Sequence, residues 1–158
     1  MKSRITEIKW GVIFTIFMLL WMLMEKLLGF HGERIEQHMI ITNFVAIPAI
    51  IIYVLALLDK RKRDLNGKMT YVQGLISGII ISIVVAVLSP LMQYITNTFI
   101  SPDFFNNMIV YTVENDIMTE QAAKDYFNLE SYIIQSTIGA PIMGILTTAI
   151  VAIFVRKK

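Results

Sequence analysis

Four long apolar blocks constrain the fold more than any other feature of this sequence. They run roughly over residues 10–28, 40–58, 71–99 and 132–155. A helix that crosses about 30 Å of hydrocarbon needs about 20 predominantly apolar residues. We therefore expect an all-α membrane protein, a bundle of four transmembrane helices that takes up residues 1–158 as a single domain.

The composition agrees with this class. Hydrophobic residues make up 56% of the chain and charged residues 16%, whereas globular domains have about 45–50% and about 25%. The chain has no cysteine, which excludes disulfides, thiolate metal sites and a cysteine nucleophile. The first block is longer than a signal-peptide core and no small-residue cleavage site follows it, so we expect it to be retained as a span.

The basic residues predict the orientation of the spans. Only Lys26, Arg34 and Lys124 lie in the two loops after the first and third blocks, where nine of the twelve acidic residues also lie. Basic loops stay in the cytoplasm, so both termini are expected there. The other eleven basic residues are Lys2, Arg4, Lys9, Lys60, Arg61, Lys62, Arg63, Lys68, Arg156, Lys157 and Lys158.

The basic loop between the second and third blocks, DKRKRDLNGK, has the composition of a nucleic-acid patch. Because membrane spans flank it on both sides, we interpret it as a topology determinant that contacts anionic lipid headgroups. The expected partners are therefore the lipid bilayer and a second copy of the chain or another membrane protein, and no nucleic acid.

The outer loop, residues 100–131, is the only sizeable segment outside the blocks. Ser101 followed by Pro102 predicts a helix start, capped by the serine. The apolar residues Phe104, Phe105, Met108 and Ile109 share one face of the predicted helix, which we expect to lie parallel to the membrane. A break at Asn115–Asp116 and a second short helix capped by Thr119 follow.

The first outer loop contains the candidate metal ligands His31, Glu33, Glu36 and His38. Their run, HGERIEQH, has no established ligand spacing, and Arg34 at its centre would repel a cation. We therefore expect no metal, no cofactor and no catalytic residue. Glu25 is the one acid expected at membrane depth, where an ionisable group suggests function, proton-coupled transport included.

Polar residues inside the third and fourth blocks stand toward their ends and form no continuous path. We expect them to make interhelical hydrogen bonds; they are Gln73, Gln93, Asn97 and Gln135. Small residues also recur every four positions in both blocks. We expect the two rows to face each other, with the pairs Gly74 and Ala152, Gly78 and Thr148, Ser82 and Gly144, and Ala86 and Ala140.

Several stretches resemble the bacterial membrane proteins grouped as domain-of-unknown-function family 4199. The resemblance covers nearly the whole chain and rests on WMLMEKLLGFHGERIEQH, TNFVAIPAIIIYVLALLDKRKR, MTYVQGLISGIIISIVVAVLSPLMQYI, ISPDFFNNMI, YFNLESYIIQ and GAPIMGILTTAIVAIFVRKK. It implies four spans and a location in the bacterial inner membrane. It implies no activity, substrate or site residue.

Three functions remain open at this stage. The leading interpretation is a non-enzymatic scaffold or interaction subunit, and the alternatives are a small transporter or channel subunit and a membrane-embedded enzyme. A cavity near the midplane lined by polar side chains would favour transport. A dry bundle with an interface of small residues would favour the scaffold.

Overall fold

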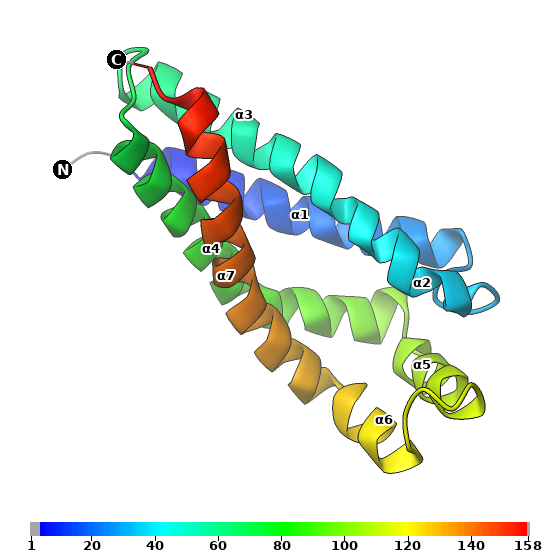
Figure 1. The fold of residues 1–158 in the computed structure, drawn as a ribbon. Helices are drawn as coiled ribbons and strands as arrows, with labels where there is room; N and C mark the ends of the chain where they lie inside the picture. The colour runs from blue at the N-terminus through cyan, green and yellow to red at the C-terminus, as the bar shows by residue number, and fades with distance from the viewer. Residues whose placement is uncertain (1–3, 158) are drawn as a thin grey trace.

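Four long helical columns make up the computed structural model, which describes residues 4–157 (Figure 1). The stretches long and apolar enough to cross a membrane are Ile5–Leu27, Ile35–Asp64, Tyr71–Ile100 and Leu129–Val155. The prediction of an all-α fold with four such helices is confirmed. The helices are α1 (Ile5–Leu27), α2 (Ile35–Ile41), α3 (Ala46–Asp64), α4 (Tyr71–Ile95), α5 (Phe104–Glu114), α6 (Glu120–Tyr126) and α7 (Leu129–Val155).

Two columns contain short segments of other helix types. The 3₁₀ turn η1 (Thr42–Val45) joins α2 to α3, and the π-helical turn η2 (Thr96–Ile100) continues α4. Pro48 falls in the first turn of α3, where a missing N–H costs little. Pro90 and Pro141 lie inside α4 and α7.

The most extensive helix contact joins α4 to α7 along the rows of small residues. A Cβ atom built on Gly74 would lie 3.1 Å from Ala152 Cβ, and one on Gly78 would lie 2.6 Å from Thr148 Cβ. On the other helix, a Cβ on Gly144 would lie 2.8 Å from Ser82 Cβ. These three predicted pairs are confirmed, so the rows pack within the chain, and the fourth, Ala86 with Ala140, stays a prediction.

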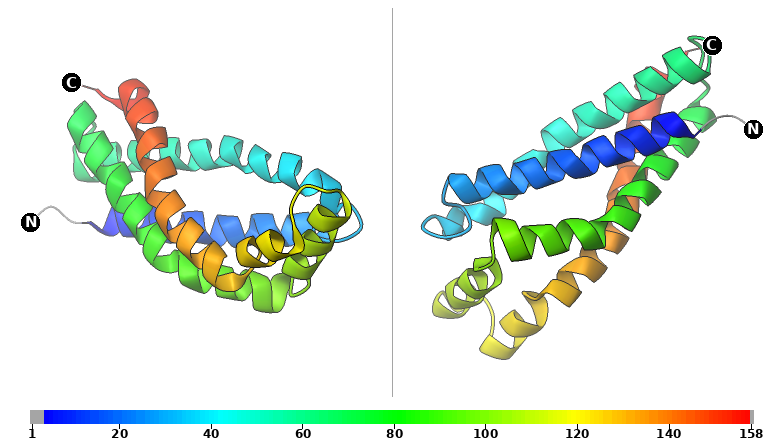
Figure 2. Two further views of the ribbon diagram at one scale, coloured as in Figure 1. Left: turned by 60° about the horizontal axis from the view of Figure 1, so that its bottom comes forward. Right: turned by 180° about the vertical axis from the view of Figure 1, so that it is seen from behind.

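The column of α3 leans away from α7. The two helices meet at one end, where Leu57 of α3 packs with Val151, Ala152 and Val155 of α7. Toward the other end they diverge, while α1 and α4 stay in contact with each other (Figure 2). Gly11 permits that close approach, because a Cβ there would lie 2.7 Å from Val84 Cβ. The divergence opens the bundle on one side.

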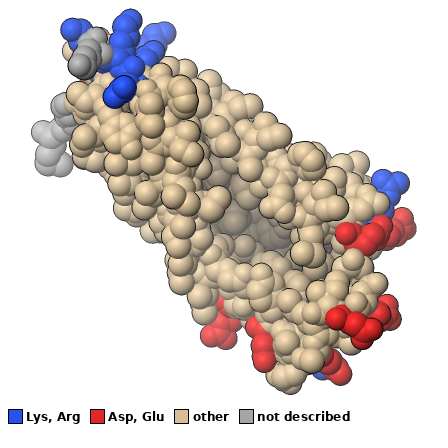
Figure 3. Space-filling model, viewed as in Figure 1, with Lys and Arg blue, Asp and Glu red and all other residues tan. Residues whose placement is uncertain are grey.

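Charge separates along the bundle. Lys and Arg gather at the end that holds both termini, here called the basic end, and Asp and Glu gather at the opposite, acidic end (Figure 3). At the basic end, Met69 and Lys157 exchange backbone hydrogen bonds of 2.8 and 2.9 Å, which tie the tail to the α3–α4 loop. Lys2 and Lys158, counted in the sequence-based prediction of orientation, lie outside the described residues.

The acidic end includes two short helices, α5 and α6. Phe104 and Met108 are buried, and Phe105 and Ile109 are half-buried. The predicted cap by Ser101 is wrong: α5 begins after Asp103, which makes no side-chain cap, and Ser101 Oγ is buried without a hydrogen-bond partner. Thr119 caps α6 as predicted, accepting from Ala122 N–H at 3.3 Å. An alignment of α5 parallel to a membrane stays a prediction.

The four amide side chains, those of Gln73, Gln93, Asn97 and Gln135, were predicted to bond between helices. This prediction is wrong: within residues 4–157 their hydrogen bonds are to groups nearby in the sequence. Gln73 forms a capping box with Thr70 at the start of α4. Asn97 donates to Gln93 and Gln135 donates to Ser131, each four residues earlier in the chain. Each amide therefore satisfies a group close to it in sequence, which a single helix allows at lower entropic cost than a cross-helix contact.

Candidate functional site

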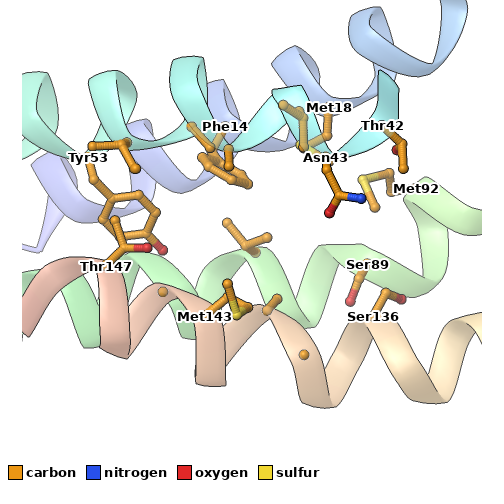
Figure 4. Close-up of a pocket in the computed structure, with 18 of the residues that line it drawn as sticks. Phe14, Met18, Thr42, Asn43, Tyr53, Ser89, Met92, Ser136, Met143 and Thr147 are labelled. Carbon is orange, nitrogen blue, oxygen red and sulfur yellow. The ribbon is translucent and has the colours of Figure 1, made fainter. Parts of the chain in front are cut away.

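A pocket of about 460 Å³ lies where α3 diverges from α7. It reaches inward to α1 and α4, and the surface is hollowed there (Figure 3). Figure 4 shows the side chains that surround the pocket. Small side chains make the space, because Ala49 of α3 faces Gly139 and Ala140 of α7 across it. The remaining wall is mostly apolar and comes from Phe14, Met18, Val45, Ala46, Ile50, Val85, Met92 and Met143.

Four of the polar side chains that line this lateral pocket already have partners in the protein. Tyr53 Oη lies 2.8 Å from Ser82 Oγ. The hydroxyls of Ser89 and Ser136 donate to backbone carbonyls three residues earlier, at 2.7 and 3.1 Å. Asn43 at the mouth donates to Met39 O at 2.6 Å. Hydroxyls satisfied by their own helix add little polarity to a cavity, so the pocket presents an apolar interior.

A second feature lies at the acidic end, where the turn after α1 folds back on the helix. Gly29 adopts φ +85°, a left-handed conformation that glycine reaches without strain. The N–H of Gly29 donates to Lys26 O and that of Phe30 to Glu25 O, the pattern of a Schellman cap. This cap directs the next residue, His31, back over the end of α1.

The turn and α2 bring two imidazoles onto one carboxylate. His31 Nε2 lies 3.2 Å from Glu25 Oε2, and His38 Nδ1 lies 3.4 Å from the same oxygen. The Glu25 side chain is 0% exposed, that of His31 1% and that of His38 10%. We call these three residues the carboxylate–histidine cluster.

Aromatic groups enclose this cluster. Trp21, one turn before Glu25, donates from Nε1 to Glu25 Oε1 at 2.5 Å. The ring of Phe104 in α5 lies 4.8 Å from the His31 ring and 4.9 Å from the His38 ring, between centroids. Asn107 of α5 donates to His31 O at 2.8 Å. The cluster is therefore held by α1, α2 and α5 together.

The structure brings together only part of the sequence-derived candidate set. His31 and His38 meet, whereas Glu33, Arg34 and Glu36 are exposed on the surface. The carboxylate in the cluster is Glu25, which the sequence analysis had considered separately. This geometry does not test the prediction that no metal is bound. That prediction was based on the spacing of possible ligands within HGERIEQH, but the cluster takes its carboxylate from Glu25, outside that run.

Sequence reasoning also missed a buried ion pair at the basic end. Lys60 Nζ lies 2.9 Å from Glu7 Oε1 and 2.6 Å from Asp64 Oδ2, and Ser77 donates to Glu7 at 3.2 Å. The Glu7 side chain is 0% exposed. The first span was predicted to begin near residue 10, but α1 begins at Ile5. Because Glu7 was placed outside the first span, its burial in the first turn of α1 was not predicted.

The comparisons with known proteins agree with the sequence resemblance. The family model described as "Protein of unknown function (DUF4199)" matches residues 9–157. The chain belongs to the DUF4199 family. No curated protein and no solved structure matches the chain. The DUF4199 match includes every lining residue of the lateral pocket and all three residues of the carboxylate–histidine cluster.

Proposed function

We propose that this DUF4199 protein is a non-enzymatic protein of the bacterial inner membrane that binds another membrane component, the hydrocarbon chain of a lipid, in the lateral pocket. The sequence favoured a non-enzymatic scaffold or interaction subunit, and this proposal specifies a lipid as the component that it binds. The observation that carries it is an apolar pocket of about 460 Å³ between two helices that are both long and apolar enough to span a membrane.

The pocket has the size and chemistry of a ligand site. Its volume falls within the range of about 300–1,000 Å³ found for small-molecule sites, which are mostly apolar with a few polar groups. Its walls come from membrane-spanning segments, and it opens to the side of the bundle between α3 and α7 (Figure 3). A lipid chain is the apolar molecule that surrounds such an opening in a bilayer.

An ion or a partner helix fits this pocket less well. An ion requires polar groups without other partners, and the pocket hydroxyls described above already have theirs. A helix with its side chains is about 10–12 Å across. It would rest on the rims of α3 and α7 and would not reach Phe14 and Met18, which form the inner wall on α1. A flexible hydrocarbon chain can enter to that depth.

The orientation that goes with this proposal puts the basic end in the cytoplasm. The separation of Lys and Arg from Asp and Glu along the bundle supports it, because basic segments are retained on the cytoplasmic side. The anionic headgroups of the inner leaflet would then lie beside Arg61, Lys62 and Arg63 of α3.

Photo-crosslinking tests where a lipid chain resides. The protein is reconstituted in vesicles that contain a phospholipid with a diazirine on its acyl chain, irradiated, digested and mapped by mass spectrometry. We expect adducts concentrated at pocket positions such as Met143 and Ala49. Adducts spread evenly over the lipid-facing residues of all four columns would contradict the proposal.

Two matched variants of α7 sharpen this test. Gly139→Leu adds a side chain at the pocket wall, where a Cβ meets no atom within 4 Å and the added atoms reduce the pocket volume. Ile138→Phe adds bulk at the neighbouring position, which is 56% exposed and outside the pocket lining. Pocket adducts should be lost in Gly139→Leu and kept in Ile138→Phe. Equal labelling of both variants would count against the pocket.

A further inference from the structure

The carboxylate–histidine cluster has the dimensions of a tetrahedral metal site. Ligands that lie about 2.0–2.1 Å from a zinc ion at tetrahedral angles are about 3.3 Å from one another. The two carboxylate–imidazole distances are 3.2 and 3.4 Å, and all three ligand atoms lie within 4.8 Å of one another. Two edges of a coordination tetrahedron are thus in place, and the third, between the two imidazoles, is no longer than 4.8 Å.

The donor atoms are concentrated at this one point of the chain. The protein has two histidines and no cysteine, and both imidazoles face the same buried carboxylate. One carboxylate and two imidazoles are the ligand set of a catalytic-type zinc centre, which leaves a fourth position for water or another ligand. No other group of three candidate ligands is found among residues 4–157.

Unsatisfied imidazole nitrogens inside the cluster are the second, independent observation. His31 Nδ1 and His38 Nδ1 are both buried without a hydrogen-bond partner in residues 4–157. Of the two, His38 Nδ1 is the one beside the carboxylate, 3.4 Å from Glu25 Oε2. A buried polar nitrogen without a partner costs free energy comparable to a lost hydrogen bond. A cation bound between Nδ1 and the carboxylate would satisfy it, because the lone pair of a neutral imidazole is a metal ligand.

The surroundings fix the ligands in place before any ion binds. Trp21 Nε1 donates to Glu25 Oε1 and so leaves Oε2 for the cluster. Phe104 packs on both imidazole rings, and Asn107 holds the backbone of His31. Outer groups of this kind orient metal ligands and increase affinity. Arg34, which would repel a cation, is exposed on the surface.

We propose that Glu25, His31 and His38 bind a divalent transition-metal ion of the zinc class at the acidic end of the bundle. Glu25 Oε2, His31 Nε2 and His38 Nδ1 are the ligands, and a water molecule takes the fourth position. Imidazole with carboxylate favours zinc over the hard cations magnesium and calcium, which prefer all-oxygen sites. The site is independent of the lateral pocket, so either proposal can fail without the other.

Metal analysis of the full-length protein tests the site. The chain is purified in detergent with an affinity tag that lacks histidine, so that its own two histidines are the only imidazoles present. It is stripped with a chelator, dialysed against zinc chloride and then metal-free buffer, and measured by elemental analysis. We expect one zinc ion per chain. Zinc at background level in the wild type would overturn the proposal.

Four single variants give the matched comparison. Glu25→Gln and His38→Gln change ligands and should lose the zinc, whereas Glu33→Gln and Glu36→Gln change exposed residues of the same loop and should keep it. Zinc retained in both ligand variants, or lost equally in all four, would contradict the assignment. Size-exclusion elution and helical circular dichroism identify any variant that has failed to fold.

A measurement on the wild type removes the dependence on folded variants. Cobalt(II) substituted into the stripped protein reports coordination through its visible absorption, since a four-coordinate site absorbs far more strongly than six-coordinate aqueous cobalt. We expect the strong bands to appear on cobalt addition and to disappear on zinc addition. A spectrum of aqueous cobalt only would exclude the site, and the cluster would then be a proton-bridged hydrogen-bond network.

Discussion

Two glutamates of α1 are completely buried, one near each end of the helix, and each has a different kind of partner. Glu7 contacts Lys60 and Ser77 at the basic end. Glu25 contacts two imidazoles and an indole at the acidic end. A carboxylate removed from water is retained only where charged or hydrogen-bonding partners compensate its desolvation. Partner chemistry therefore distinguishes an ion pair from a candidate metal site.

Removing the carboxylate of Glu7 should destabilise the bundle. In Glu7→Ala, the buried Lys60 ammonium keeps Asp64 but loses the Glu7 oxygen 2.9 Å away. Breaking a buried pair costs about 3–5 kcal/mol, and we expect about 3 kcal/mol because Asp64 remains. The free energy of unfolding is measured by titration with sodium dodecyl sulfate in mixed micelles.

The exposed pair of α6 provides the control for this prediction. Lys124 and Glu120 also form an ion pair, but both side chains are more than half exposed. Glu120→Ala should therefore leave stability unchanged. The double variant Glu7→Leu with Lys60→Met should recover most of the loss, since apolar groups of similar volume replace the pair. A Glu7→Ala variant as stable as Glu120→Ala would refute the structural role of the pair.

At the scale of helices, the α4–α7 contact depends on the absence of side-chain atoms at a few positions. Gly78→Ala puts a Cβ 2.6 Å from Thr148 Cβ, and the helices must separate to admit it. Overpacking of this kind costs about 1–3 kcal/mol. We expect a corresponding fall in the free energy of unfolding in mixed micelles.

Gly139→Ala, in α7, is the matched control for the α4–α7 contact. A Cβ there meets no atom within 4 Å, and replacing a helical glycine by alanine should stabilise the protein by about 0.5–1 kcal/mol. Opposite signs for the two alanine variants are the expected result. If Gly78→Ala were as stable as Gly139→Ala, the close approach of α4 and α7 would be incorrect.

The sequence predicted some contacts between helices and missed others. The register of α4 against α7 was predictable because small residues recur every four positions in both helices and the helices are antiparallel. Gly78 of α4 therefore lies opposite Thr148 of α7. The carboxylate–histidine cluster was not, since it depends on the cap at Gly29 and the direction of α2. Nor was the lateral pocket, because divergence of α3 from α7 reflects packing at one end that no local pattern encodes.

For the molecule as a whole, the charge separation predicts the orientation in the membrane. Single cysteines replace Arg63 at the basic end and Asn115 at the acidic end; both positions are exposed and the chain has no other cysteine. With a membrane-impermeant thiol reagent on intact cells, Asn115→Cys should be labelled and Arg63→Cys should not, because basic loops remain in the cytoplasm. Both should react after the membranes are opened. Labelling at position 63 but not at 115 would show that the basic end lies outside the cytoplasm and would contradict the predicted orientation.

The lateral pocket is the central claim about function, and native mass spectrometry of the detergent-extracted protein tests it most directly. The spectrum counts the lipids that remain on each chain as detergent is removed. The account predicts one retained phospholipid on the wild type and on Ile138→Phe, and none on Gly139→Leu, whose added side chain occupies the pocket. Wild-type chains without lipid, or a Gly139→Leu variant that retains it equally, would contradict the account.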